Sequence, residues 1–201
     1  NYIYATSDNA IWVHQYIGNR ASFDFRGRQV EAEIEGNYPW SGDVSLKLNP
    51  GKPLKTQLRL HIPEWCGEWS VAVNGETVTP LIEKGYAVID RKWRDGDVVS
   101  LSLEMPARMV AADPRVKEDE GCRAVQRGPL VYCMEEADNP SGFETLALAQ
   151  DAVFSEAFRP DLLDGVVEVD ARADGGDIHF IPYCAWDNRA PGRMRVWVPL
   201  Q

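Results

Sequence analysis

The chain has 201 residues and a formal net charge of −10, from 31 acidic and 21 basic side chains. This length allows one large β domain or two small ones, with enough buried surface to fold without a disulfide or a metal. Negative charge repels phosphate backbones and anionic lipid surfaces, and no apolar run approaches the roughly 20 residues of a membrane-spanning helix. We therefore expect neither nucleic-acid nor membrane binding.

The chain opens on Asn1-Tyr2-Ile3-Tyr4-Ala5, in the middle of a structural pattern, as though an upstream segment were missing. We predict a short helix over residues 1–6. There is no initiator methionine, basic leader or signal-peptide core. The sequence leaves the compartment open, with the cytoplasm as our expectation.

Most of the chain alternates between apolar and polar side chains, which is typical of half-buried antiparallel strands. The alternation predicts strands over residues 43–49, 54–62, 98–105 and 193–198. Asn74-Gly75 predicts a tight hairpin, because both residues tolerate positive φ. A second short helix is predicted over residues 160–164, ended by Gly165.

Many short strands with regular turns predict an all-β fold: two β-sandwich domains, jelly-roll or immunoglobulin-like, with mainly antiparallel strands and very little helix. The best boundary lies between Met105-Pro106 and Asp113-Pro114, where a strand ends and an acidic loop begins. Each side then has about a hundred residues, the size of one sandwich. We assign residues 1–107 to the first domain and residues 108–201 to the second.

Three carboxylates, Glu31, Glu33 and Glu35, alternate along one predicted strand and so share one face. Neighbours would be ~7 Å apart, within the separation of acid and base in an inverting glycosidase. A catalytic pair also needs a cleft and two unequal environments, which nothing in the sequence indicates. We interpret the row as a solvated strand face, with a self-contained hydrolase as the alternative.

The four cysteines do not form a recognisable metal or disulfide pattern, so we predict buried free thiols. They are Cys66, Cys122, Cys133 and Cys184. The pairs His61 with Cys66 and His179 with Cys184 lack the short paired spacing of a zinc site. No nucleophile elbow, phosphate loop or dinucleotide fingerprint occurs. We therefore assign no catalytic, cofactor-binding or metal-ligating residue.

Seven tryptophans could include a platform on which sugar rings stack: Trp12, Trp40, Trp65, Trp69, Trp93, Trp186 and Trp197. Our main expectation is that they fill sandwich cores or contact a neighbouring domain. Trp197 has the opposite parity to Val196 and Val198, so it should lie off the core. Arg189 and Arg193, near Asp187, should form loop ion pairs or interface contacts.

Three ordered blocks resemble glycoside hydrolase family 127, the bacterial β-L-arabinofuranosidase family long described as a domain of unknown function. They are Asn37-Tyr38-Pro39-Trp40-Ser41-Gly42, Ala124-Val125-Gln126-Arg127-Gly128-Pro129-Leu130-Val131-Tyr132 and Pro182-Tyr183-Cys184-Ala185-Trp186-Asp187-Asn188-Arg189-Ala190-Pro191-Gly192. The stretch from Leu58 to Cys66, followed by Val73-Asn74-Gly75, resembles the same family's middle region. Together these blocks span nearly the whole chain in the family's order.

In that family an α/α barrel precedes the middle and C-terminal β domains. The resemblance therefore implies that residues 1–5 end the barrel, that residues from about 11 to 107 are the middle domain, and that the rest is the C-terminal one. It also implies a retaining reaction with a cysteine nucleophile, a zinc ion held by a glutamate and several cysteines, and a second glutamate for proton transfer. The family's Cys-Cys-Pro block is absent here, since none of the four cysteines adjoins another, so no role transfers to any residue.

We therefore hypothesise that the chain is a non-catalytic accessory region of a β-L-arabinofuranosidase-like glycoside hydrolase, with no cofactor of its own. The resemblance makes the upstream barrel its partner and suggests a homodimer through the C-terminal sandwich. The alternative is a carbohydrate-binding, lectin-like module for plant-type glycans, motivated by the aromatic content.

Overall fold

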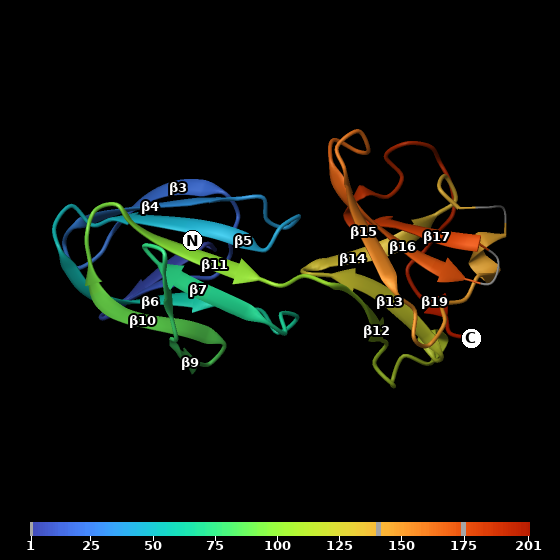
Figure 1. Cartoon of the computed structure of the whole chain (residues 1–201), viewed down its shortest axis with the longest axis horizontal. Coiled ribbons are helices and arrows are strands. Elements are labelled where there is room, and N and C mark those ends of the chain that lie inside the picture. The colour runs from blue at the N-terminus through green and yellow to red at the C-terminus, as the bar shows by residue number, and fades with distance from the viewer. Residues whose placement is uncertain (1, 140–141, 174–175) are drawn as a thin grey trace. The chain divides into compact units, whose positions relative to one another are not determined.

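The computed structural model of the chain describes residues 2–139, 142–173 and 176–201. The chain divides into two compact units, Asn1–Met105 and Pro106–Gln201 (Figure 1). Both units consist of β-strands, and the helical elements among the described residues are three 3₁₀ helices of one turn each: η1 (Lys117–Asp119), η2 (Phe143–Thr145) and η3 (Tyr183–Ala185). The prediction of an all-β fold with very little helix is confirmed. No helix in the described ranges has the length and apolarity that a membrane crossing requires.

Two facing sheets make up the first unit. In spatial order, one sheet contains β1 (Tyr4–Ser7), β2 (Ala10–Val13), β6 (Leu54–His61), β10 (Tyr86–Trp93) and β9 (Leu81–Glu83). The other contains β3 (Asn19–Asp24), β4 (Gln29–Gly36), β5 (Asp43–Asn49), β11 (Asp97–Leu103), β7 (Trp69–Val73) and β8 (Glu76–Val78). Among these strands β2 and β6 pair in parallel, and the other pairs are antiparallel.

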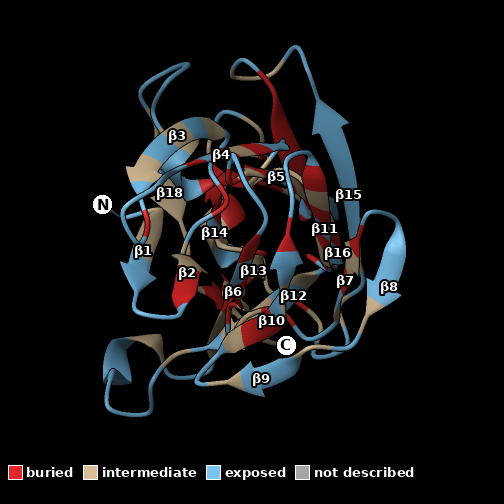
Figure 2. Ribbon diagram, turned by 90° about the vertical axis from the view of Figure 1, so that its left-hand side faces the viewer, coloured by how far each residue is buried: buried red, intermediate tan, exposed pale blue. Residues whose placement is uncertain are grey.

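The core of the first unit lies between its sheets, because alternate side chains of each strand point inward. The inward residues of β5 and β6 are buried, as their alternation predicts: Val44, Leu46, Leu48, Leu54, Leu58 and Leu60. Buried residues are red in Figure 2. Trp93 is 1% exposed, and its indole N–H donates to the Thr56 carbonyl over 3.1 Å, so its one polar atom is satisfied inside the core.

The block Asn37–Gly42 forms the loop between β4 and β5. The amide groups of Trp40 and Ser41 donate to the Asn37 carbonyl, over 2.7 and 2.9 Å. The amide of Leu103 donates to the Gly42 carbonyl over 3.1 Å. A Cβ atom on Gly42 would lie 1.8 Å from the Leu103 carbonyl oxygen, so only glycine lets the loop approach β11 this closely.

The second unit is a curved sheet folded over its own core. In spatial order its strands are β12 (Ala107–Ala111), β13 (Cys122–Arg127), β14 (Leu130–Glu135), β17 (Gly176–Pro182), β16 (Val166–Ala173) and β15 (Phe154–Arg159), with β18 (Met194–Arg195) on β14 and β19 (Val198–Pro199) on β13. Glu156 of β15 joins the two ends, because it accepts hydrogen bonds from the Ala107 amide at 2.7 Å and from Nε of Arg127 at 2.5 Å. The hydrophobic core of the second unit, which the sheet encloses, includes Tyr132, Phe143 and Phe180.

Three predicted elements are wrong. Residues 4–7 of the predicted first helix form β1, in which Tyr4 pairs with Val13, while residue 1 lies outside the described residues. The segment 160–164 forms turns, with Leu163 and Asp164 at φ of 51° and 61°, which a right-handed helix does not tolerate. The strand predicted over 193–198 is broken by a bend at 196–197, because β18 and β19 pair with different strands.

Candidate functional site

The three alternating carboxylates Glu31, Glu33 and Glu35 lie on the outer face of β4. Glu31 and Glu35 are exposed, and Glu33 forms an ion pair with Arg20 of β3. Glu35 borders a shallow groove of about 480 Å³, lined otherwise mainly by serine and small apolar residues. This is the solvated strand face that the sequence predicts, and it does not provide the unequal environments of an acid–base pair.

His61 and Cys66, which the sequence predicts to be unrelated, lie in different surroundings. His61 lies on the outer face of β6 and packs against the ring of Tyr86, with centroids 5.3 Å apart. Cys66 is buried, and its thiol donates to the carbonyl of Glu68 over 3.0 Å. Burial raises the pKa of the Cys66 thiol, which keeps it protonated at neutral pH.

All four cysteines are free thiols, as predicted, but only Cys66 and Cys133 are buried. Cys122 is half-buried and Cys184 is exposed, so the prediction of burial is wrong for these two. Cys184 lies in the short helix η3 rather than in a strand, where no alternation assigns it to the core. Burial, with a further contribution from the Glu135 charge, raises the pKa of Cys133 to about 12.

The closing block Pro182–Gly192 is fastened to the end of β14 by charged groups. Glu135 is 1% exposed and accepts a hydrogen bond from the Asp187 amide over 2.9 Å. Arg189 forms ion pairs with both Glu135 and Asp138. The hydrogen bond with Asp138, and then the one with Glu135, raise the pKa of Arg189 despite its partial burial.

Arg193 forms a second, more exposed set of ion pairs, with Glu136 and Glu144. Its hydrogen bonds lower the pKa of Glu136 to about 2. The prediction of loop ion pairs is therefore confirmed for both arginines. Their carboxylate partners lie at the end of β14 and in the residues after it, however, whereas Asp187 donates its backbone amide to Glu135. Sequence reasoning missed these acidic partners because they are about 50 residues away along the chain.

The tryptophans are distributed over both units. Trp93 fills the first core, while Trp65 and Trp69 pack against its edge. Trp12 is half-buried on the outer face of β2, where the Arg59 guanidinium lies 4.6 Å from its ring centroid. In the second unit the rings of Trp186 and Tyr183 are nearly parallel, with centroids 6.4 Å apart. Trp40 and Trp197 are half-buried, so the expected exposure of Trp197 is only partial.

An aromatic pocket of about 340 Å³ opens in the first unit. Its walls include Tyr16, Tyr38 and Trp65, with His14 and His61 also lining it. The Tyr16 hydroxyl donates to the His61 carbonyl over 2.6 Å, so it is held in place. Burial, and then the neighbouring His61, lower the pKa of His14, which leaves its ring neutral at neutral pH. Aromatic walls with neutral polar groups suit an uncharged ligand.

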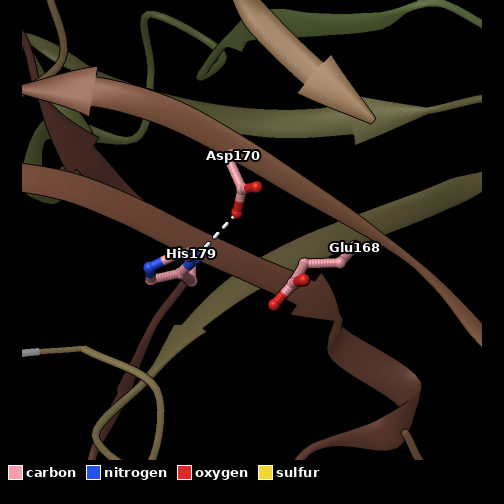
Figure 3. A group of neighbouring side chains, drawn as sticks. All are labelled: Glu168, Asp170 and His179. Atoms are coloured by element: carbon pink, nitrogen blue, oxygen red, sulfur yellow. Dashed lines mark hydrogen bonds and ion pairs between the residues drawn. The ribbon is translucent and has the colours of Figure 1, made fainter. Parts of the chain in front are cut away.

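A three-residue cluster in the second unit has the composition of a metal site. Glu168 and Asp170 lie on β16, and His179 lies opposite Asp170 on β17. One potential ligand atom from each residue lies within 4.8 Å of the other two, and the described ranges contain no other such trio. Figure 3 shows Asp170 and His179 pointing toward one another, joined by a hydrogen bond of 2.8 Å between Oδ1 and Nδ1.

Sequence reasoning weighed His179 together with Cys184, judged the two unrelated, and missed the cluster. The signal was available, because Glu168 and Asp170 alternate along a strand and therefore share a face. The hairpin that follows places His179 directly across from Asp170.

Comparison with known proteins settles the relationship. The model of the β-L-arabinofuranosidase middle domain of glycoside hydrolase family 127 matches residues 10–105. The model of that family's C-terminal domain matches residues 107–199. The chain belongs to glycoside hydrolase family 127. The resemblance carried by the three sequence blocks is thereby confirmed.

Individual relatives of family 127 agree with this assignment. The chain is 33% identical over 227 residues to a non-reducing end β-L-arabinofuranosidase of Bifidobacterium longum subsp. longum, with 98% of this chain and 34% of that protein covered. A crystal structure of Ara127N-Se, a family 127 β-L-arabinofuranosidase from Geobacillus stearothermophilus T6, matches with a TM-score of 0.94 and 40% identity, over 100% of this chain and 35% of that one. The structure of the family 127 β-arabinofuranosidase BT3674 matches with a TM-score of 0.92 and 32% identity, over 99% of this chain and 36% of that one. The chain thus spans about one third of the length of these relatives.

Proposed function

We propose that this chain is a non-catalytic accessory region of a β-L-arabinofuranosidase-like enzyme, and that the bond-breaking groups lie in another part of a longer polypeptide. The observation that carries the proposal is the pair of family matches, to the middle and C-terminal domains. In this role one sandwich supports the catalytic barrel that the family resemblance implies. The other covers a surface or pairs with a second copy.

The thiol chemistry supports the proposal. The family resemblance implies a cysteine thiolate and a zinc ion held by a glutamate and several cysteines. Cys66 belongs to the first unit and the other three cysteines to the second. Burial raises the pKa values of Cys66 and Cys133, which disfavours the thiolate that both nucleophilic attack and zinc ligation require. Cys66 and Cys133 therefore do not fit that zinc site, and the trio of potential metal ligands among the described residues, Glu168, Asp170 and His179, contains no cysteine.

The test is hydrolysis of β-L-arabinofuranosides by the chain alone, with and without added zinc. We expect no turnover above the buffer rate in either condition. The variant Glu33→Gln serves as a control for the row of Glu31, Glu33 and Glu35, and it should give the same rate as the unaltered chain. Clear turnover by the unaltered chain would contradict the proposal.

A carbohydrate-binding role is the second candidate, and the pocket lined by Tyr38 and Trp65 is the observation that favours it. Its volume and neutral aromatic lining fit a sugar ring, which stacks its C–H face on aromatic side chains. Titration with arabinose oligomers, followed by tryptophan fluorescence, tests this role. Binding of the oligomer should weaken in His14→Ala. It should persist in His179→Ala, because His179 lies in the second unit. A flat fluorescence response up to millimolar ligand removes this candidate.

A further inference from the structure

We infer that Glu168, Asp170 and His179 form a binding site for a divalent transition-metal cation on the outer face of the second unit's sheet. The inference stands apart from the accessory role proposed above. It rests on the spacing, rigidity and charge of these side chains.

The spacing of the three side chains fits one ion. Their potential ligand atoms lie within 4.8 Å of one another, and Nδ1 of His179 is 2.8 Å from Oδ1 of Asp170. Two ligands at right angles around an ion, each bound at roughly 2.1 Å, are about 3 Å apart. The ion can therefore replace the hydrogen bond between Asp170 and His179 with little side-chain movement. The displaced proton passes to the other ring nitrogen or to solvent.

The backbone of the cluster is rigid before any ion binds. Asp170 and His179 are directly paired across β16 and β17. The His179 amide donates to Oδ1 of Asn139 over 2.9 Å, and Nδ2 of Asn139 donates to the His179 carbonyl over 3.0 Å. Little conformational entropy is then lost when a ligand binds, which favours affinity.

The cluster brings two carboxylates together, and Arg159 is the ion-pair partner of one of them, Glu168. The Glu168 side chain is only 10% exposed, and Arg159 balances its charge over 2.5 Å. Arg159 is itself 44% exposed, and its guanidinium also lies 3.9 Å from Asp161. In our proposal Arg159 neutralises Glu168 when no metal is bound and moves toward Asp161 when the ion arrives. A 2+ ion also offsets the overall charge of −10.

The donor set selects the class of ion. One imidazole nitrogen and two carboxylate oxygens suit Mn²⁺, Fe²⁺ or Zn²⁺ rather than soft ions that require thiolates. Mn²⁺ is the best probe, because zinc would also bind the exposed thiol of Cys184. Binding would cross-link the neighbouring strands β16 and β17 and so stabilise the second unit.

The experiment is titration of the chain with Mn²⁺, followed by the loss of the free-ion signal in electron paramagnetic resonance. We expect one saturable site below 1 mM, roughly the range of weak protein sites for hard cations. His179→Ala and the near-isosteric Asp170→Asn should each weaken binding by at least about tenfold. His61→Ala, which removes a strand histidine from the first unit, should leave the affinity unchanged. Circular dichroism checks that each variant folds.

Arg159→Gln separates a metal site from an ordinary ion-pair network, because it removes the competing cation. We expect this variant to bind Mn²⁺ more tightly than the unaltered chain, whereas loss of a purely structural partner would not raise affinity. Absence of saturable binding, binding unaffected by His179→Ala, or an unchanged or lower affinity in Arg159→Gln would overturn the assignment.

Discussion

Replacing Arg189 with methionine should destabilise the second unit strongly, because it leaves the buried charge of Glu135 without its cationic partner. Glu135 is 1% exposed, and Arg189 is its ion-pair partner inside the closing block. Methionine preserves much of the length and apolar volume of the arginine stem. The change therefore removes the charge and the hydrogen bonds to Glu135 and Asp138 while largely maintaining the packing.

The magnitude follows from the surroundings of Glu135. Removing one partner of a buried ion pair costs about 3–5 kcal/mol. The Asp187 amide still donates to Glu135, and the Arg189 side chain is 25% exposed, so we expect the lower end, about 3 kcal/mol. The Tm of a domain of this size shifts by roughly 4 °C or more per kcal/mol, which gives a decrease in Tm of at least about 12 °C.

Differential scanning calorimetry of the whole chain measures this shift, with the affected transition assigned to the second unit through the fluorescence of Trp186 and Trp197. Arg193→Met is the matched control. It removes an arginine from the same segment, but that side chain is 58% exposed and its carboxylate partners are 39% exposed. The control should lower the Tm far less, because solvent screens exposed ion pairs. Equal shifts for both variants, or a loss under about 1 kcal/mol for Arg189→Met, would contradict the role of Arg189 in neutralising the buried Glu135 charge.

Three further predictions concern separate parts of the chain. With a thiol reagent at pH 8, Cys184 should react rapidly, whereas Cys66 and Cys133 should react only after unfolding. Peptide mapping that finds Cys133 labelled in the folded chain would contradict this prediction. The carboxyl pKa of Glu136, followed by NMR, should be about 2 and should return toward roughly 4.3 in Arg193→Met. Because this folded-state pKa is depressed, the associated stability is present above about pH 4 and is lost as the pH falls toward 2; an unchanged pKa in the variant would argue against the ion pair. Gly42→Ala should destabilise the first unit by about 1–3 kcal/mol in urea unfolding, because its Cβ would meet the Leu103 carbonyl. Gly67→Ala is the control and should be nearly neutral, because the space around that position is open. Similar losses of stability in both variants would be inconsistent with the contact between Gly42 and Leu103.

The all-β fold could be predicted from the sequence because burial of one strand face leaves a period of two. The inward residues of β5 and β6 follow that period and are buried as expected. The period carries no information about pairing partners, which explains the error over 193–198, where β18 and β19 join different strands. Residues 1–6 are too few for a helical period to be distinguished from an edge strand.

The polar clusters were less accessible to sequence reasoning. Arg189 was recognised as an ion-pair residue, but its partner Glu135 lies 54 positions away, and only the fold brings them together. The cluster of Glu168, Asp170 and His179 forms across one hairpin, so register alone could have revealed it. That spacing differs from the short cysteine and histidine motifs by which metal sites are usually recognised.

The accessory role proposed above requires that this chain contain no nucleophile that accepts a glycosyl group. Intact-mass spectrometry after incubation with a β-L-arabinofuranoside and zinc tests it most directly, because a retaining reaction leaves a sugar on the nucleophile during turnover. We expect an unchanged mass at every time point. A pentosyl adduct mapped to Cys66, Cys122, Cys133, Cys184 or a carboxylate would contradict it.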